Sequence, residues 1–372
     1  MRILISGICG FVGSTLTSAL LNVEPSLEIL GIDNFSRAGS ELNRRKLTTR
    51  GVRVIAGDIR VASDVESLPN VDYVIDAAAI PSVLAGVDGK TSSRQLVEHN
   101  LLGTVNLLEF CKQHSAGFIL LSTSRVYSIA PLANLEMQVV DMGFQPTTEQ
   151  RFPYGISTEG VGEGFGTLPP VSLYGSTKVA SEQLTLEYGA TFGFPVWINR
   201  CGVMAGAGQF GHPMQGIFAF WIHSFREGAP LRYIGFAATG HQVRDCMHPR
   251  DLVPLLLSQM TQEARLTPSR VLPSLPTTHV CNVGGGRASA ISLAQLTRWC
   301  TTRYPKSPAL RSLKAATEPS DARRFDIPWM VLDHRLATAT WNWMPQTSTS
   351  EVLCEIADFA DSHPEWLNKT CQ

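Results

Sequence analysis

The sequence predicts an α/β protein with a doubly wound parallel sheet and a smaller, interleaved C-terminal substrate domain. Three observations carry this prediction. Short apolar runs alternate with helical patterns through residue 125, as expected for strands connected by crossover helices. A glycine-rich turn follows the first apolar run, and strand-like runs return late in the chain at 195–199 and 278–283. Because these late runs can rejoin the first sheet, the two units are expected to interleave in sequence.

The chain opens with a strand, a tight turn and a helix. The apolar run 2–6 leads directly into Gly7, Gly10 and Gly13. Glycine suits such a turn because a side chain would collide with a bound diphosphate or force a positive φ, while the following helix offers free N–H donors. This arrangement is typical of a Rossmann dinucleotide site. The predicted cofactor-binding residues of the turn are Gly7, Gly10, Phe11, Val12 and Gly13.

The second apolar run, 27–32, ends in Asp33, 20 positions after Gly13. A carboxylate at this place accepts the adenine ribose hydroxyls and repels a 2′-phosphate, so the sequence favours NAD over NADP. Three nearby arginines leave NADP open as the alternative. These are Arg37, Arg44 and Arg45. The third run, 52–56, leads into Asp58 and Ile59, which are suited to the adenine edge. The predicted cofactor residues of this part are Asp33, Asn34, Arg37, Asp58 and Ile59.

Further strands are expected at 73–77 and 117–121, with a helix from about 97 to 113. Ligands of such sheets gather at the carboxyl ends of the strands. The predicted cofactor residues here are Ala77, Ala78, Asn100 and Ser122. Beyond residue 130 the pattern loosens into a Pro/Gly-rich stretch, which we interpret as an active-site loop.

A Y-x-x-x-K pair, Tyr174 and Lys178, opens the next helix. Residues four apart share a helix face, so both side chains point to one place. A phenol ionises near pH 10 and needs a neighbouring positive charge to act as a base; Lys178 and an oxidised nicotinamide could supply it. Thr123, at the end of a strand, could bond the reacting oxygen. The alternative for each residue alone is packing or local capping.

Composition excludes several function classes. The 372 residues carry a formal net charge of −1, which favours small-molecule partners over nucleic acid or an anionic membrane. No apolar run is long enough to span a bilayer. The eight cysteines show no metal-ligand spacing, so we expect no metal and reduced thiols. No secretory signal is visible at the N-terminus, and we expect a cytoplasmic protein.

The glycine turn, Asp33, Thr123 and the Tyr174/Lys178 pair together resemble the extended short-chain dehydrogenase/reductase family, specifically its NAD-dependent sugar-nucleotide epimerases and dehydratases. The resemblance implies NAD as cofactor, a nucleotide-sugar as partner and a homo-oligomer. It also implies a dinucleotide-binding domain over residues 1–200, with returning segments near 240–285, and a mainly sugar-nucleotide-binding domain over 201–372.

Four segments resemble the CDP-paratose 2-epimerase branch of that family. They are 33–43, 206–216, 240–248 and 320–323. The branch implies that guanidinium groups hold the substrate diphosphate, and it implies further contacts to the sugar. The residues implied are Arg200, Gln209, Phe210, Gln215, Arg244 and Arg323. Structural ion pairs with Asp245 and Asp321 are the alternative for Arg244 and Arg323.

The implied reaction is inversion at C2 of a CDP-sugar, by transient oxidation to a keto intermediate and re-reduction. A UDP-sugar 4-epimerase is the nearest alternative. Dehydration is disfavoured because Ser124 and Arg125 stand where dehydratases of this family carry Asp-Glu. A catalytically silent NAD-binding sensor or scaffold is the alternative from another class.

Overall fold

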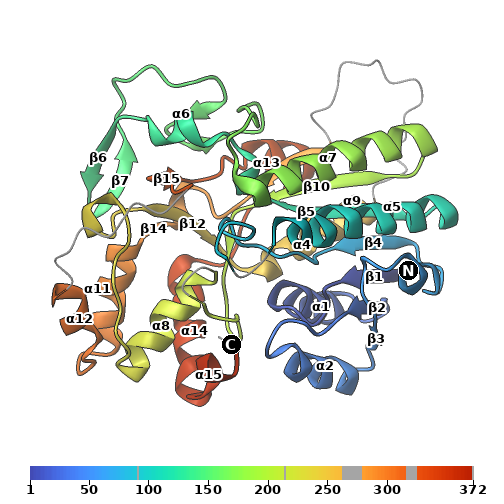
Figure 1. The fold of residues 1–372 in the computed structure, drawn as a ribbon, viewed down its shortest axis with the longest axis horizontal. Helices are drawn as coiled ribbons and strands as arrows, with labels where there is room; N and C mark the ends of the chain where they lie inside the picture. Colours follow the sequence, from blue (N-terminus) through green and yellow to red (C-terminus); the bar gives the residue numbers. More distant parts are fainter. Residues whose placement is uncertain (90–91, 213–214, 262–278, 316–324, 371–372) are drawn as a thin grey trace.

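A computed structural model describes residues 1–89, 92–212, 215–261, 279–315 and 325–370. Its centre is a seven-stranded sheet of order β13-β10-β5-β4-β1-β2-β3 (Figure 1). The strands are β1 (Arg2–Ser6), β2 (Glu28–Asp33), β3 (Arg53–Ala56), β4 (Tyr73–Asp76), β5 (Gly117–Thr123), β10 (Val196–Cys201) and β13 (Val280–Val283). All their pairings are parallel. The predicted doubly wound parallel sheet is therefore confirmed, and both late strands rejoin it.

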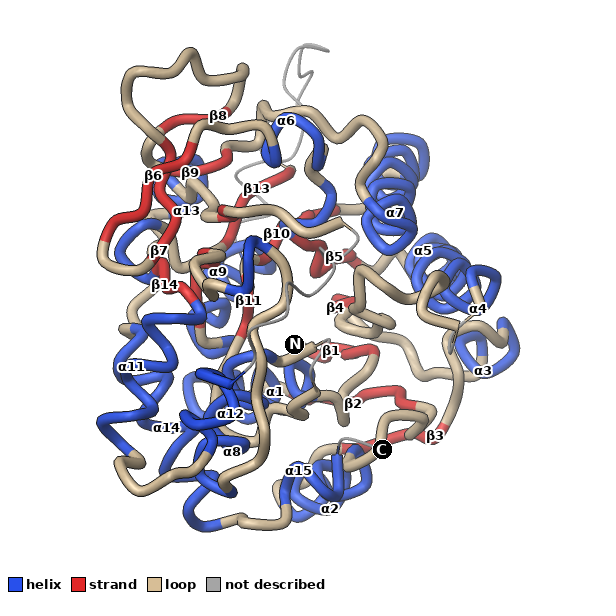
Figure 2. The backbone as a smooth tube through the Cα atoms, turned by 60° about the vertical axis from the view of Figure 1, so that its left-hand side comes forward, coloured by secondary structure: helices blue, strands red, loops and turns tan. Residues whose placement is uncertain are grey.

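Helices cover both faces of this sheet because its strands are apolar on both sides. Ile3 and Ile5 pack into one core with α1 (Phe11–Val23), α9 (Val253–Thr261) and α13 (Arg335–Trp341). Leu4 points the other way, into a core shared with α3 (Ala62–Glu66) and α5 (Gly103–His114). On that second face also lies α7 (Ser172–Phe192), the helix of Tyr174 and Lys178 (Figure 2).

The helix predicted from about 97 to 113 is interrupted. A π-helical turn, Glu98–Leu102, separates α4 (Ser93–Val97) from α5. Such turns insert an extra residue and often lie near functional sites. Here the turn directs Asn100 inward, where its side chain is 1% exposed.

The second unit is built from later segments around a small sheet of β11, β12 and β14, to which β15 pairs. Its helices lie beside the first unit (Figure 1). The end of the C-terminal helix lies against the start of α2 (Ser40–Thr49), where a Cβ on Gly39 would lie 2.8 Å from Thr370 Cγ2. The remaining strands are β6 (Met137–Val140), β7 (Gly143–Pro146), β8 (Ile156–Ser157), β9 (Gly160–Val161), β11 (Val203–Met204), β12 (Val243–Met247), β14 (Ala290–Ser292) and β15 (Trp329–Met330). The remaining helices are α2 (Ser40–Thr49), α6 (Ile129–Ala133), α8 (Ile217–Glu227), α11 (Leu293–Arg303), α12 (Ala309–Ala315), α14 (Thr349–Ser362) and α15 (Trp366–Thr370).

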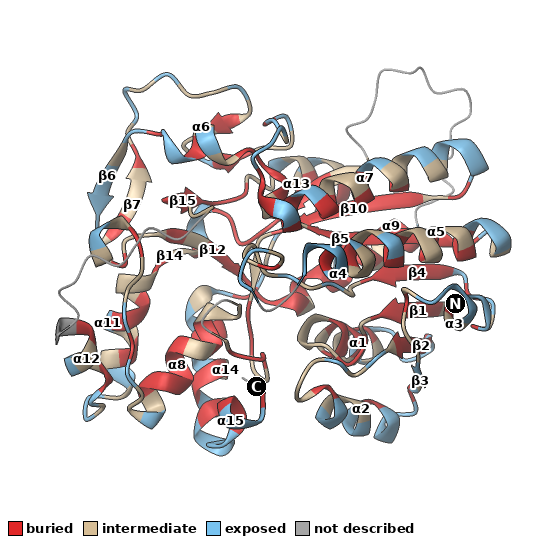
Figure 3. Cartoon of the chain, in the orientation of Figure 1, coloured by how far each residue is buried: buried red, intermediate tan, exposed pale blue. Residues whose placement is uncertain are grey.

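Burial follows this plan. The central strands are buried along most of their length, whereas the outer face of α7 and the strand β6 are exposed (Figure 3). No helix of the described part of the chain is long and apolar enough to cross a membrane.

Candidate active site

A cavity of about 1020 Å³ lies at the carboxyl ends of the parallel strands, facing the second unit. This is where ligands of open α/β sheets bind, and the volume suits a molecule the size of two nucleotides. Most of the predicted site residues line it. They are Gly7, Gly10, Phe11, Val12, Gly13, Asp33, Asn34, Arg37, Asp58, Ile59, Ala77, Ala78, Ser122, Thr123, Tyr174, Lys178, Gln209, Phe210, Gln215 and Arg244.

The glycine turn has the geometry that a dinucleotide requires. Gly7 has φ +61°, and an added Cβ there would lie 2.9 Å from Ala78 Cα. A Cβ on Gly13 would lie 2.4 Å from Gly7 O, so the turn and α1 pack without room for a side chain. No side chain caps the N-terminus of α1. Its first N–H groups therefore have no partner within the helix and fit a diphosphate.

Asp33 is the last residue of β2 and lies beside this turn. Its carboxylate accepts the N–H of Cys9 at 2.9 Å and of Phe35 at 2.8 Å. Burial raises the pKa of Asp33, and these N–H donors oppose the rise. Nearby, Asp58 accepts bonds from Arg60 and Asn34, which hold its pKa well below the usual range. Both carboxylates line the cavity, so this end favours hydroxyl donors over a phosphate.

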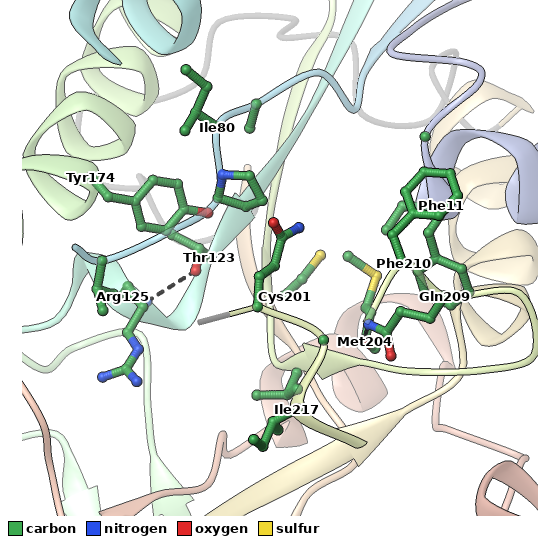
Figure 4. Close-up of a pocket in the computed structure, with 18 of the residues that line it drawn as sticks. Phe11, Ile80, Thr123, Arg125, Tyr174, Cys201, Met204, Gln209, Phe210 and Ile217 are labelled. Atoms are coloured by element: carbon green, nitrogen blue, oxygen red, sulfur yellow. Dashed lines mark hydrogen bonds between the residues drawn. The ribbon is translucent and has the colours of Figure 1, made fainter. Parts of the chain in front are cut away.

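The reactive cluster lies across the cavity from the turn. Tyr174 and Thr123 point toward one another (Figure 4). Burial raises the pKa of Tyr174 to about 12, opposed by the neighbouring Thr123 hydroxyl and by the positive charge of Arg125. Burial lowers the pKa of Lys178, opposed by Asp76. The phenol is therefore protonated in this state, and it ionises readily only when further positive charge enters the cavity.

The cavity wall formed by the second unit carries groups suited to a polar ligand. Gln209 Nε2 donates to Met204 O at 2.8 Å, while Gln209 Oε1 is buried without a partner among the described residues. Phe210 stacks on Trp366 with ring centroids 5.9 Å apart. Arg244 Nη2 lies 2.9 Å from Asp326 Oδ1. Arg244 therefore has an ion-pair partner, as the structural alternative expected, but this partner is Asp326 and not Asp245.

Arg200 and Asn100, unlike most of the predicted site residues, do not line the cavity. The guanidinium of Arg200 lies against Glu182, with 2.6 Å between Nη2 and Oε2, because β10 directs it beneath the strand ends. Asn100 bonds both backbone groups of Ile80 and the hydroxyl of Thr177. It thus holds the loop after β4 in place, and every polar atom of its side chain is occupied. Arg323 lies outside the described residues.

The Pro/Gly-rich stretch beyond residue 130 was expected to be an active-site loop, and this expectation is wrong. No residue between 126 and 173 lines the cavity. The stretch forms two hairpins that pack elsewhere: Val161 bonds Val331 and Asp333, and Glu163 accepts the N–H of Asn282 at 2.6 Å. Its glycines permit close packing, since a Cβ on Gly160 would lie 2.6 Å from Asp333 N.

Several lining residues were not predicted. They are Ser40, His99, Arg125, Cys201, Met204, Trp221, Arg232 and Asp326. Cys201 and Arg125 follow predicted strands, so the rule that ligands gather at strand ends could have identified them. Burial raises the pKa of Cys201 to about 12, which keeps it a neutral thiol. Nothing in the local sequence marks Trp221 or Asp326.

The comparisons with known proteins agree on one family of enzymes. The family model described as "NAD dependent epimerase/dehydratase family" matches residues 3–272. The CDP-paratose 2-epimerase of Salmonella typhi is 28% identical over 97% of this chain and 100% of its own length. UDP-glucuronate 4-epimerase 1 of Arabidopsis thaliana is 26% identical over 72% of this chain and 57% of its own length.

A solved structure has the same fold. It is a variant of the UDP-glucuronic acid 4-epimerase of Bacillus cereus, in complex with a fluorinated UDP-sugar and NAD. The TM-score is 0.71 at 24% identity, covering 97% of this chain and 99% of the other.

Proposed function

This chain belongs to the NAD dependent epimerase/dehydratase family, and on that premise we propose that it inverts one carbon of a nucleotide-activated sugar. Membership confirms the predicted family, the NAD cofactor and the enzyme class. We propose C2 of a CDP-sugar as the inverted centre. The support is similarity to the CDP-paratose 2-epimerase of Salmonella typhi along nearly the whole of both chains, together with the reactive cluster described above.

The observation that carries the proposal is the Tyr174/Thr123 pair beside Lys178 in one cavity with the glycine turn. Tyr174 removes the proton from a sugar hydroxyl, and Thr123 holds that oxygen. Lys178, buried to 2% exposure, contributes positive charge that favours the ionised phenol. NAD, when bound, supplies the acceptor and later the donor of the hydride. No atom is gained or lost overall, so the product is a stereoisomer of the substrate.

The glycine turn, Asp33 and Asp58 would hold NAD at one end of the cavity. Arg244 would hold the diphosphate of the sugar nucleotide from the other wall, because a guanidinium forms paired bonds with phosphate oxygens. An anchor at the diphosphate leaves the sugar free to turn between the two hydride transfers. Return of the hydride to the opposite face then inverts the carbon. The same turning also explains why one set of residues serves both steps.

Dehydration requires an acid next to Thr123 to assist elimination. Ser124 and Arg125 stand at these positions, and Arg125 lines the cavity with a positive charge. A guanidinium cannot deliver a proton near neutral pH, since it stays protonated above pH 12. The site is therefore better suited to epimerisation.

Inversion at C4 of a UDP-sugar is the second candidate, favoured by the similarity to UDP-glucuronate 4-epimerase 1 of Arabidopsis thaliana. To separate the two, purified protein is incubated with CDP-, UDP-, GDP- and dTDP-sugars, including CDP-paratose, without added reductant. NMR then follows the stereochemistry of each carbon. Inversion at C2 of a CDP-sugar supports the proposal; inversion at C4 of a UDP-sugar replaces it. No conversion of any sugar would favour a silent NAD-binding protein.

A further inference from the structure

A buried ion pair lies directly behind the cavity wall at the end of β5. Arg200 Nη2 lies 2.6 Å from Glu182 Oε2, and Arg200 Nε lies 3.1 Å from each carboxylate oxygen. The Glu182 side chain is 1% exposed and that of Arg200 9%. A buried charge is tolerated only when it is paired and fully bonded, so both groups are fixed in place.

Ser122 gives the Glu182 carboxylate a further hydrogen bond. Its hydroxyl donates to Glu182 Oε1 at 2.5 Å. An ion-paired carboxylate only accepts hydrogen bonds, so the hydrogen must come from Ser122. A serine hydroxyl has one hydrogen and two acceptor lone pairs, and normally rotates between donor and acceptor roles. With its hydrogen held by Glu182, Ser122 presents only lone pairs to the cavity that it lines.

The three residues join the elements that carry the reactive cluster. Tyr174, Lys178 and Glu182 follow one another at four-residue spacing on α7, and therefore lie on one face of that helix. Ser122 and Arg200 are paired across β5 and β10, and the next pair in register is Thr123 and Cys201, which line the cavity. Glu182 thus forms a clamp that holds α7 against β5 and β10, at the pair of residues directly before Thr123 and Cys201.

The hydrogen bonds of this clamp, formed by Glu182, Arg200 and Ser122, continue to β13. Arg200 Nη1 donates to the Tyr127 hydroxyl at 3.3 Å, and that hydroxyl donates to Asn282 Oδ1 at 2.6 Å. Asn282 belongs to β13. One buried chain of bonds therefore ties α7 to three neighbouring strands, which leaves the Ser122 hydroxyl little freedom to reorient.

We propose that Glu182 is a positioning residue for NAD: it fixes Ser122 as a hydrogen-bond acceptor for an amide N–H or ribose hydroxyl of the cofactor. We assign the donor to the cofactor because Ser122 lines the same cavity as the glycine turn and directly precedes Thr123, the residue proposed to hold the sugar oxygen. The sugar approaches from the opposite wall. This inference rests on the NAD dependence of the family and needs no particular sugar.

The test compares Ser122→Ala, Glu182→Gln and Glu187→Gln in the full chain. Glu187 is exposed on the same helix, so its variant matches the chemical change outside the clamp. NAD affinity is measured by calorimetric titration, and the melting temperature in parallel. Loss of one hydrogen bond should weaken NAD binding about fivefold to tenfold in Ser122→Ala. Glu182→Gln should weaken it at least as much, because the amide can turn the Ser122 hydroxyl around. Glu187→Gln should remain within about twofold of wild type.

The double variant Ser122→Ala/Glu182→Gln decides whether Glu182 acts through Ser122. The proposal predicts an NAD affinity near that of the weaker single variant, since both changes remove one acceptor. Independent, multiplying losses would overturn it, as would normal NAD affinity in Ser122→Ala. A lower melting temperature with unchanged NAD affinity in Glu182→Gln would reduce the pair to a structural role. Should Glu182→Gln not fold, Glu182→Asp, whose shorter side chain moves the carboxylate away from Ser122, replaces it in the single and double variants. Absent sugar turnover in wild type would refute the proposed function while leaving this titration readable.

Discussion

The two walls of the cavity are built in different ways. The cofactor wall is formed by strand ends and first helical turns of the first unit, with Gly7 to Gly13 and Asp33 at one end and the Tyr174/Lys178 face across from them. The opposite wall is assembled from separate segments that include Gln209, Trp221 and Asp326. Residues on strand ends and packed helices are held more exactly than residues on loops. Under the proposed function, the first unit would carry out the hydride chemistry at its sheet edge, and the second unit would recognise the sugar nucleotide.

The largest effect should follow loss of the base. Tyr174→Phe removes the proton acceptor, and we expect kcat to fall about 10³-fold, within the range for general acid–base catalysis. NAD affinity should change less than about threefold, because the ring is retained. Steady-state kinetics and NAD titration measure both. Tyr188→Phe is the matched control: Tyr188 lies on the same helix, but its hydroxyl bonds Glu109. Turnover of Tyr174→Phe within about threefold of wild type would contradict the assignment.

The recognition wall should respond differently. Arg244→Ala removes the guanidinium proposed for the diphosphate and leaves Asp326 without its ion-pair partner. We expect KM for the sugar nucleotide to rise about 100-fold, as for loss of charge-assisted bonds, while NAD affinity is largely kept. Arg298→Ala serves as the control, since Arg298 pairs with Asp141 on the surface. Equal weakening of sugar and NAD binding would show that the walls are not separate in function.

Acid should lower the stability of the second unit, because His223 takes up a proton. This residue on α8 is 1% exposed, and burial lowers its pKa from 6.5 to about 4, with Arg226 and His363 adding to the effect. A lowered histidine pKa means that the folded state disfavours the charged ring. The stability contribution is therefore full above pH 6.5 and lost as pH falls toward 4.

Denaturant unfolding at pH 7 and pH 4 tests this. The free energy of unfolding should fall by about 2 kcal/mol more in wild type than in His223→Gln, which cannot take up the proton. Tryptophan fluorescence follows the unfolding, because Trp221 lies on α8 together with His223. An equal fall in both proteins would exclude His223 as the cause.

The smallest effect concerns the choice of dinucleotide. Asp33→Asn removes the negative charge beside the predicted adenosine ribose, so the ratio of NADP to NAD affinity should rise about fivefold. Titration with both dinucleotides measures the ratio. Glu28→Gln is the control, since Glu28 lies at the opposite end of β2 and pairs with Arg2 at the surface. An unchanged ratio in Asp33→Asn would place selectivity on the neighbouring arginines instead.

Local patterns predicted the cofactor wall well because its parts are short and contiguous. The strand, turn and helix around Gly7 lie within the first 23 residues, and the Tyr174/Lys178 pair needs only one helical turn. The prediction failed where position depends on distant partners. The glycines at 160–166 were interpreted as part of an active-site loop, whereas Gly160 permits the close approach of residues 331–333.

Two arginines illustrate the limit of the sequence. By itself, the sequence determined the parallel sheet, the glycine turn and the reactive pair, since hydrophobic periodicity and helix spacing are local properties. It could not separate Arg200 from Arg244, because both lie within strands. Tertiary structure alone decided that Arg200 meets Glu182 behind the sheet and that Arg244 meets Asp326 inside the cavity. The partner of a charged side chain depends on which elements pack together, and that is settled only when the whole chain folds.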